Sequence, residues 1–348
     1  MRPTRSPTPR PALHLSQRNI QARTLVCRNG PAGYLAITLR ELLRELVRAA
    51  GRRSVGRLES PAAAGAAPVG LAPLRRVVLA DEVSRALFAE FTAHRSSDRG
   101  GEETGWALLG LRRADEAVAL ATLPAGTARD ADEAHVKFNS AAQAFASRVV
   151  RQGHRQLALL GVVHTHPGSL RHPSTGDFRG DIEWVTNLRG GEGVFGIGTA
   201  DAEPRPDAGI SWQPAPNVQC FGELCLSWYV LGKRDRNYRP LPVGLTIGPD
   251  LAAPLRPVWD ELEAHAERLD RLARQLSRVK FEVAAGREKA ALTLTVPLPE
   301  EGRSVRVELE GKDVRYRLLT PDGALAADLR EDRVDVGVFL MLSELAAR

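Results

Sequence analysis

The sequence predicts an α/β fold in which helices cover a mixed sheet, followed by a smaller α+β unit with an antiparallel meander. Two patterns support this prediction. Between residues 76 and 235, near-continuous apolar runs typical of buried strands alternate with amphipathic helical segments. From Leu292 onward, the apolar period changes to two, which indicates antiparallel strands with one face in water.

The elements of the first unit follow from their apolar periods and capping residues. In chain order we expect a strand at Arg76–Leu79, a helix from Asp81, strands at Trp106–Leu111 and Ala117–Leu123, a helix from Asn139 or Ser140, a strand at Leu157–His164, a helix at Asp177–Leu188, and strands at Val194–Ala200 and Leu224–Leu231.

The second unit begins with an amphipathic helix at Val258–Val279. Alternating segments at 292–296, 305–309 and 314–318 then predict strands, and the turns between them fall at Gly311–Asp313 and Pro321–Gly323. A final apolar helix at 334–347 closes this unit. A chain of 348 residues is long enough for two such domains, each with its own core.

Three regions result. Residues 1–74 form a basic, largely disordered extension, residues 75–240 form the first domain, and residues 250–348 form an α+β domain of unknown role. The extension contains one amphipathic helix, 39–50, whose apolar stripe from Leu39 to Val47 offers a surface for a partner protein. Residues 60–73 read as a flexible linker.

The positive charge lies in this extension. Residues 1–77 hold 14 Arg and three Glu, which leaves the remaining chain with 34 basic and 39 acidic residues. A basic tail is able to touch nucleic acid, but a solvated tail explains the same charge, and the mildly acidic body argues against nucleic acid as a partner.

Composition also bears on location. No window approaches 18 uncharged apolar residues, and the first 30 residues lack the apolar region of a secretory signal, so we expect no membrane partner. The three cysteines, Cys27, Cys220 and Cys225, include no CxxC pair. We therefore expect a reducing cytoplasm, with Cys220 and Cys225 as small apolar residues in and before a buried strand.

The stretch from Gly161 to Asp177 carries the chemistry. Side chains at i and i+2 of a strand share a face, so His164 and His166 direct two imidazoles into one pocket at the end of a strand. Pro167 ends the strand, and the loop returns the chain to Asp177 at the start of a helix. Two imidazoles and a carboxylate suit Zn²⁺ and leave a fourth position for water, as in catalytic zinc sites.

Hydrolysis at such a site needs a proton carrier. Glu103, directly before the buried strand, is the candidate general acid/base. Ser174, three residues before Asp177, is placed either to donate to an oxyanion or to cap the helix. His172 is expected at the rim, and Asp181 either orients a ligand or lies on the surface.

These residues resemble the JAMM motif of the JAB/MPN metallopeptidase family. In that motif, His-x-His-Pro is followed by six residues, Ser, two residues and Asp, and the segment from His164 to Asp177 matches it without a gap. The run from Glu103 to Gly110 fits the upstream Glu context. One departure is that Gly105 lies two residues after Glu103 rather than three, a spacing that Glu102 would restore, so Glu102 remains the alternative.

The resemblance covers about residues 76–235 and implies a cytidine-deaminase-like fold. It further implies a Zn²⁺-dependent metallopeptidase that cleaves peptide or isopeptide bonds at the C-terminus of ubiquitin or ubiquitin-like proteins, which would be its partners. Two alternatives stay open: a non-catalytic JAB/MPN scaffold that binds partner proteins, and a DNA-associated protein similar to the RadC family, which has a similar loop.

Overall fold

The computed structural model describes residues 70–127, 130–131, 136–137, 140–203 and 211–347. The predicted helix 39–50 and the basic extension before residue 70 lie outside these residues. No helix within the described ranges is both long and apolar enough to cross a membrane.

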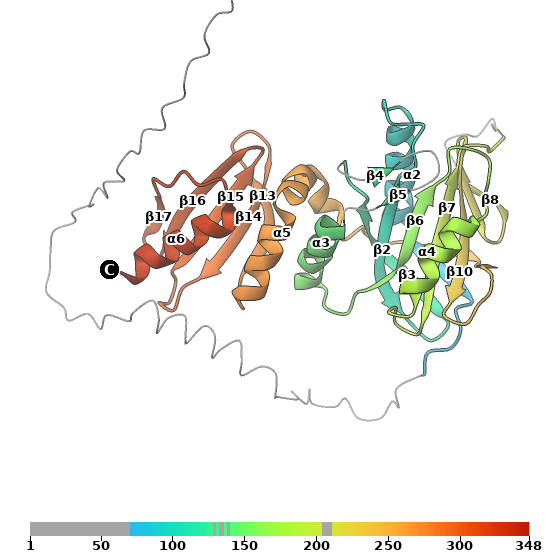
Figure 1. The fold of residues 1–348 in the computed structure, drawn as a ribbon, viewed down its shortest axis with the longest axis horizontal. Helices are drawn as coiled ribbons and strands as arrows, with labels where there is room; N and C mark the ends of the chain where they lie inside the picture. The colour runs from blue at the N-terminus through green and yellow to red at the C-terminus, as the bar shows by residue number, and fades with distance from the viewer. Residues whose placement is uncertain (1–69, 128–129, 132–135, 138–139, 204–210, 348) are drawn as a thin grey trace, which may run out of the picture. The chain divides into compact units, whose positions relative to one another are not determined.

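The first sheet is mixed, as predicted (Figure 1). Among the described residues it has ten strands, in the order β12-β1-β3-β2-β6-β7-β10-β9-β8, with β11 paired to β10. Strand β1 runs parallel to β3 and β12, β6 runs parallel to β7, and the other pairs are antiparallel. The strands are β1 (Arg76–Ala80), β2 (Gly105–Arg112), β3 (Glu116–Pro124), β6 (Ala158–Thr165), β7 (Glu192–Thr199), β8 (Trp212–Ala215), β9 (Val218–Phe221), β10 (Leu224–Gly232), β11 (Arg239–Pro240) and β12 (Val243–Thr246).

Three helices cover this sheet, namely α2 (Asp81–Arg95), α3 (Ser140–Gly153) and α4 (Thr175–Val185). Successive residues of a strand face opposite sides, so the packing partners show which face each helix covers. Helix α2 packs with Trp106 and Leu108 of β2, whereas α3 packs with Ala107 and Leu109 of the same strand. The two helices therefore cover opposite faces. A small strand pair, β4 (Asp130–Ala131) and β5 (Val136–Lys137), precedes α3.

Strand β2 changes register against both neighbours halfway along its length. Against β6, Leu108 pairs with Gly161 but Leu109 pairs with Leu159, so Leu160 is an extra residue in β6. A matching shift between Leu109 and Gly110 occurs against β3. Such bulges insert one residue on one strand and increase the local twist.

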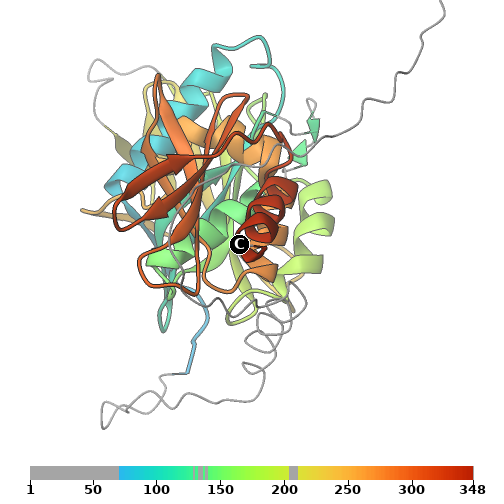
Figure 2. The ribbon, with the colours of Figure 1, turned by 90° about the vertical axis from the view of Figure 1, so that its left-hand side faces the viewer.

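The second sheet confirms the predicted antiparallel meander (Figure 2). Strands β14 (Ala290–Pro297), β15 (Ser304–Glu310) and β16 (Asp313–Thr320) correspond to the three alternating segments, and β13 (Lys280–Ala285) and β17 (Gly323–Ala326) extend the sheet on either side. It is preceded by the 3₁₀-helix η1 (Ala253–Val258) and α5 (Trp259–Gln275), and followed by α6 (Val334–Ala346). Helices α5 and α6 pack with its apolar face.

The two sheets share a hydrophobic core. Helix α3, which lies on the first sheet, packs against α5 (Figure 1). The ring of Phe145 on α3 meets that of Phe281 on β13 edge-on, with centroids 4.8 Å apart. Gln152 of α3 also donates to the carbonyl of Val279 and accepts from the backbone N–H of Phe281. The first sheet itself continues past residue 240, because β12 pairs with β1.

The two cysteines of the first sheet correct one expectation. Cys220 and Cys225 were expected to be separate apolar side chains, but the structure joins them in a disulfide across β9 and β10. They are direct partners in the antiparallel ladder, and their Cα atoms lie 4.2 Å apart. A close cross-strand pair brings two side chains on the same face together, which the spacing in the sequence alone does not reveal.

Candidate metal centre

The two histidines lie at the end of a buried strand. His164 is the penultimate residue of β6, and His166 follows the strand, with its backbone N–H donating to the carbonyl of Gly198 on β7. Both side chains are buried, with exposed fractions of 6% and 7%. Upstream, Gly161 lets β6 approach β7 closely, because a Cβ at this position would overlap the carbonyl oxygen of Val194. Pairing with β7 thus fixes where both rings point.

Asp177 belongs to the first turn of α4. Ser174 caps this helix, since its Oγ accepts the backbone N–H of Asp177 at 3.2 Å. In return, Oδ2 of Asp177 accepts the backbone N–H of Ser174 at 2.5 Å. This reciprocal capping box starts the helix at Thr175, two residues before the predicted start. A carboxylate at this end is also favoured by the helix dipole.

The structure brings the three predicted ligands together. His164 Nε2 lies 3.1 Å from His166 Nε2 and 3.2 Å from Oδ1 of Asp177, and His166 Nε2 lies 3.5 Å from Oδ2 of Asp177. With ligand distances of about 2.0–2.1 Å, neighbouring corners of a zinc tetrahedron are about 3.3–3.4 Å apart. The donor set and its spacing therefore fit a tetrahedral ion held by three protein atoms.

The electrostatics of the cluster favour metal binding. Burial by itself would raise the pKa of Asp177, but the hydrogen bonds with His164 and His166 outweigh it and hold this pKa well below its usual range. Burial would lower the pKa of His166, yet the hydrogen bonds to Asp177 and to the Leu170 carbonyl raise it. The Asp177 carboxylate is therefore ionised at neutral pH and faces the rings of His164 and His166. A cation between these three side chains would be stabilised by the negative charge of the carboxylate.

Strand register places Glu103 beside the histidines. In the ladder of β2 and β6, Gly105 pairs with His164, and the backbone N–H of Thr165 donates to the carbonyl of Thr104. Continuing this register sets Glu103 opposite His166, and opposite residues share a face of the sheet. Glu103 is 4% exposed, and its charge contributes to the raised pKa of His166.

Glu102 has a different environment. Its carboxylate pairs with Arg99, with Oε2 lying 2.7 Å from Nε and 2.6 Å from Nη2. The ring of His94 contacts the Glu102 carbonyl at 2.8 Å. Its side chain thus pairs with a neighbouring arginine in the loop after α2, whereas Glu103 is the glutamate that the strand register directs toward the metal ligands.

One protein family matches part of the sequence. Residues 84–213 match the family described as prokaryotic homologs of the JAB domain. This part of the chain is similar to a prokaryotic JAB domain. JAB domains include metal-dependent hydrolases. The matched range holds Glu103, both histidines, Ser174 and Asp177, and it ends within β8, before β9, β10 and the second sheet.

A solved structure is also similar to this chain. It is the solution structure of a protein from Desulfitobacterium hafniense, with 15% sequence identity and a TM-score of 0.33, covering 50% of this chain and 94% of that one. No curated protein matches the sequence significantly.

Two further polar residues of the JAB domain lie near the ligands. Asp181 is hydrogen-bonded to the hydroxyl of Tyr238 at 2.7 Å and to the indole of Trp184 at 3.1 Å, and burial raises its pKa to about 6. His172 is exposed, and its Nδ1 is 2.9 Å from the hydroxyl of Tyr229. Trp184 is three residues after Asp181 on the same helix, whereas Tyr238 and Tyr229 are 57 residues away from Asp181 and His172, so the local sequence carried no signal for these two tyrosines.

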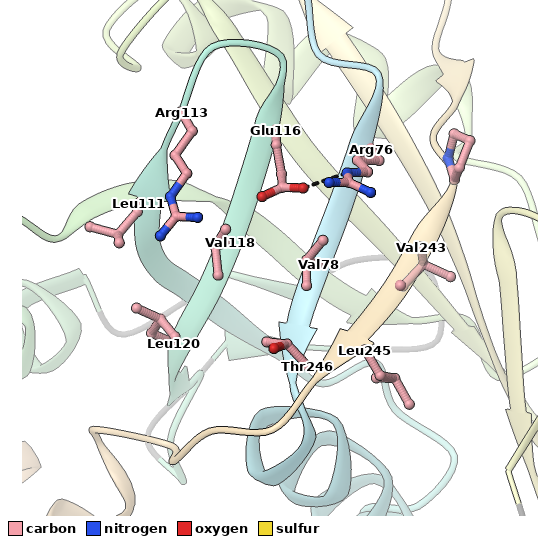
Figure 3. A pocket seen from close by; sticks show the side chains of 12 residues that line it. Arg76, Val78, Leu111, Arg113, Glu116, Val118, Leu120, Val243, Leu245 and Thr246 are labelled. Carbon is pink, nitrogen blue, oxygen red and sulfur yellow. Dashed lines mark ion pairs between the residues drawn. The ribbon is translucent and has the colours of Figure 1, made fainter.

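The first sheet also has a groove away from this centre (Figure 3). It has a volume of about 580 Å³ and lies over β1, β3 and β12, with Val78, Val118 and Leu245 in its lining. The charged pair Arg76–Glu116 crosses it. None of the predicted site residues line this groove.

Proposed function

We propose that the protein is a zinc-dependent hydrolase of peptide or isopeptide bonds. The observation that carries this proposal is the spacing of His164, His166 and Asp177, which matches the edge of a zinc tetrahedron. The buried Glu103, two residues before the strand β2 that pairs with β6, adds the proton carrier that such a hydrolase needs.

The bound zinc would polarise the scissile carbonyl and lower the pKa of a water molecule. The Glu103 carboxylate accepts a proton from this water as the water oxygen bonds to the carbonyl carbon. It then delivers that proton to the leaving nitrogen as the carbon–nitrogen bond breaks. Ser174 uses its hydroxyl lone pair for the helix cap, which leaves its O–H proton to stabilise the oxyanion.

The substrate class follows from the resemblance to the JAMM motif. We propose that the scissile bond joins the C-terminal tail of a ubiquitin-like protein to a lysine or to a following peptide. The JAB domain match and the ungapped motif support this substrate class.

Zinc content tests the site. Elemental analysis of the purified full-length protein should find about one zinc per chain, and Asp177→Ala should lose it because two ligands hold zinc far more weakly than three. Melting curves of the metal-free proteins check that the variant is folded. A folded wild type that takes up no zinc when zinc is added would reject the hydrolase and favour the partner-binding scaffold.

Paired glutamate variants test the proton carrier. Glu103→Gln should keep its zinc and lose cleavage of ubiquitin-like fusion proteins by about 100-fold or more, because an amide accepts no proton at neutral pH. Glu102→Gln is the matched control and should stay near wild type, since Glu102 pairs with Arg99. Equal losses in both variants, or full activity in Glu103→Gln, would contradict the assignment.

A further inference from the structure

The segment between the two histidines and Asp177 is held by polar contacts. We call residues 167–173 the ligand loop, because it joins His166 to the start of α4. Pro167, Gly168, Ser169 and Leu170 are all exposed, so apolar burial contributes little to holding them. The conformation of the ligand loop depends instead on the next residue, Arg171.

Arg171 is clamped to the end of β7. Its Nε lies 3.0 Å from both carboxylate oxygens of Asp201, and its Nη2 donates to the Asp201 carbonyl at 3.2 Å. Asp201 is itself oriented by the hydroxyl of Thr199, the last residue of β7, at 2.7 Å. The half-buried ion pair thus ties the ligand loop to a strand of the sheet.

A second contact holds the backbone of the same residue. The hydroxyl of Tyr229, on β10, donates to the carbonyl of Arg171 at 2.8 Å. Because the only proton of this hydroxyl is donated to the Arg171 carbonyl, the hydroxyl oxygen accepts a hydrogen bond from Nδ1 of His172. Both the side chain and the carbonyl of Arg171 are therefore fixed.

The peptide before Arg171 touches a metal ligand. The carbonyl oxygen of Leu170 lies 2.7 Å from Nδ1 of His166. Because a carbonyl only accepts, this contact requires the proton on Nδ1 and leaves the lone pair of Nε2 free for a metal. Partners of this kind orient a ligating ring.

We propose that Arg171 is a positioning residue of the metal centre. Its ion pair with Asp201 holds the Leu170 carbonyl against His166, and so sets the ring orientation and tautomer of His166 before a metal arrives. This role rests on the proposed zinc site and adds two residues, Arg171 and Asp201, that are not among the defined residues of the JAMM motif.

Zinc affinity tests the proposal without any substrate. Metal-free full-length protein is titrated with zinc against a chromogenic chelator for wild type, Arg171→Gln and Asp201→Asn. Both variants should bind zinc about 10–100-fold more weakly, the usual effect of losing a partner that orients a ligand. The matched control is Arg148→Gln, which removes a comparable ion pair, that with Asp270 between α3 and α5, and should stay within about twofold of wild type.

The tautomer of His166 provides a second readout that general destabilisation does not mimic. Nitrogen-15 NMR of metal-free wild type, recorded at a pH where His166 is neutral, should show one His166 tautomer, with the proton on Nδ1, and both clamp variants should show a mixture. Exchanging the charges, with Arg171→Asp and Asp201→Arg together, should recover part of the zinc affinity.

The outcomes separate this inference from the proposed function. Wild type that binds no zinc would overturn the zinc site itself. Wild type that binds zinc, with both clamp variants equal to it in affinity and in the His166 tautomer, would overturn only the role of Arg171.

Discussion

At the scale of the residue, one hydroxyl has an observed role as a helix cap and a proposed role in the reaction. Ser174 Oγ accepts the N–H of Asp177 and thereby starts α4, while its own proton stays available for a substrate oxyanion. In the proposed hydrolase, the position of a ligand and the stabilisation of a transition state would thus depend on a single small side chain.

This double role predicts two separable losses. Ser174→Ala should lower the stability by about 1 kcal/mol through the lost cap, and lower kcat by about 100–1,000-fold through the lost donor. Ser174→Thr keeps the hydroxyl and should retain most of both. Thermal melts and turnover of a ubiquitin-like fusion measure the two effects. A kcat for Ser174→Ala within a few-fold of wild type would leave the residue with the capping role alone.

The sequence predicted the placement of the ligands better than that of their supports. His164, His166 and Asp177 lie in one short stretch, where strand period and helix start determine their positions. Arg171 and Asp201 are 30 residues apart, and Arg171 and Tyr229 are 58 apart, so their contacts depend on strand order in the sheet. The preference for Glu103 over Glu102 likewise depends on register, which side-chain periodicity does not provide.

At the scale of the element, a carboxylate holds a turn together. Glu310, at the end of β15, accepts the backbone N–H groups of Arg287, Glu288 and Lys289, at 3.0, 2.7 and 3.0 Å. These bonds, with Glu288 contributing most, lower the pKa of Glu310 to about 2. The turn between β13 and β14 is therefore fastened to the third strand of its sheet.

The lowered pKa gives a pH-dependent stability. A carboxyl group with a depressed folded-state pKa stabilises the protein fully above its unfolded pKa of 4.5, and this contribution is lost as the pH falls toward 2. Glu310→Gln should thus lower the melting temperature clearly at pH 7, and the gap to wild type should narrow below about pH 4.5. Glu301→Gln, in an exposed turn, serves as control. A gap that is constant down to pH 3 would contradict the charge-dependent contribution.

Most elements were predictable because their apolar periods were strong. Helices α2, α3 and α6 and strands β2, β3 and β6 begin within two residues of the expected positions. Strand β17 was missed because all four of its residues are exposed and it lacks an alternating pattern. Strand β13 was missed because it follows directly after the segment expected to be helical, of which α5 occupies only residues up to Gln275.

At the scale of the whole molecule, the two sheets are not independent. Their shared core runs from β2 and β3 through α3 and α5 to the second sheet and α6. The sequence suggested two domains with separate cores, because periodicity shows which face of an element is apolar but does not show what that face meets.

A shared core predicts a common unfolding transition. Phe281→Ala should cost about 3–5 kcal/mol, because it removes a buried ring that packs on Phe145. The unfolding midpoint measured by tryptophan fluorescence, to which Trp106 and Trp228 of the first sheet contribute, should fall together with the midpoint measured by circular dichroism. Leu325→Ala, at a site 61% exposed, is the control and should change little. A fluorescence midpoint that stays in place while the dichroism midpoint falls would show that the sheets unfold separately.

The bulge in β6 determines which of two adjacent glutamates faces the metal ligands. At the far end of the ladder, Gly110 faces Ala158, and an unbroken count from there would bring Glu102 opposite His166 and turn Glu103 to the other side of the sheet. The surplus residue, Leu160, moves the pairing by one step. A continuous ladder that kept Leu160 would therefore exchange the two glutamates without altering either of them, so a backbone irregularity six residues before His166 decides which carboxylate lies opposite that ring.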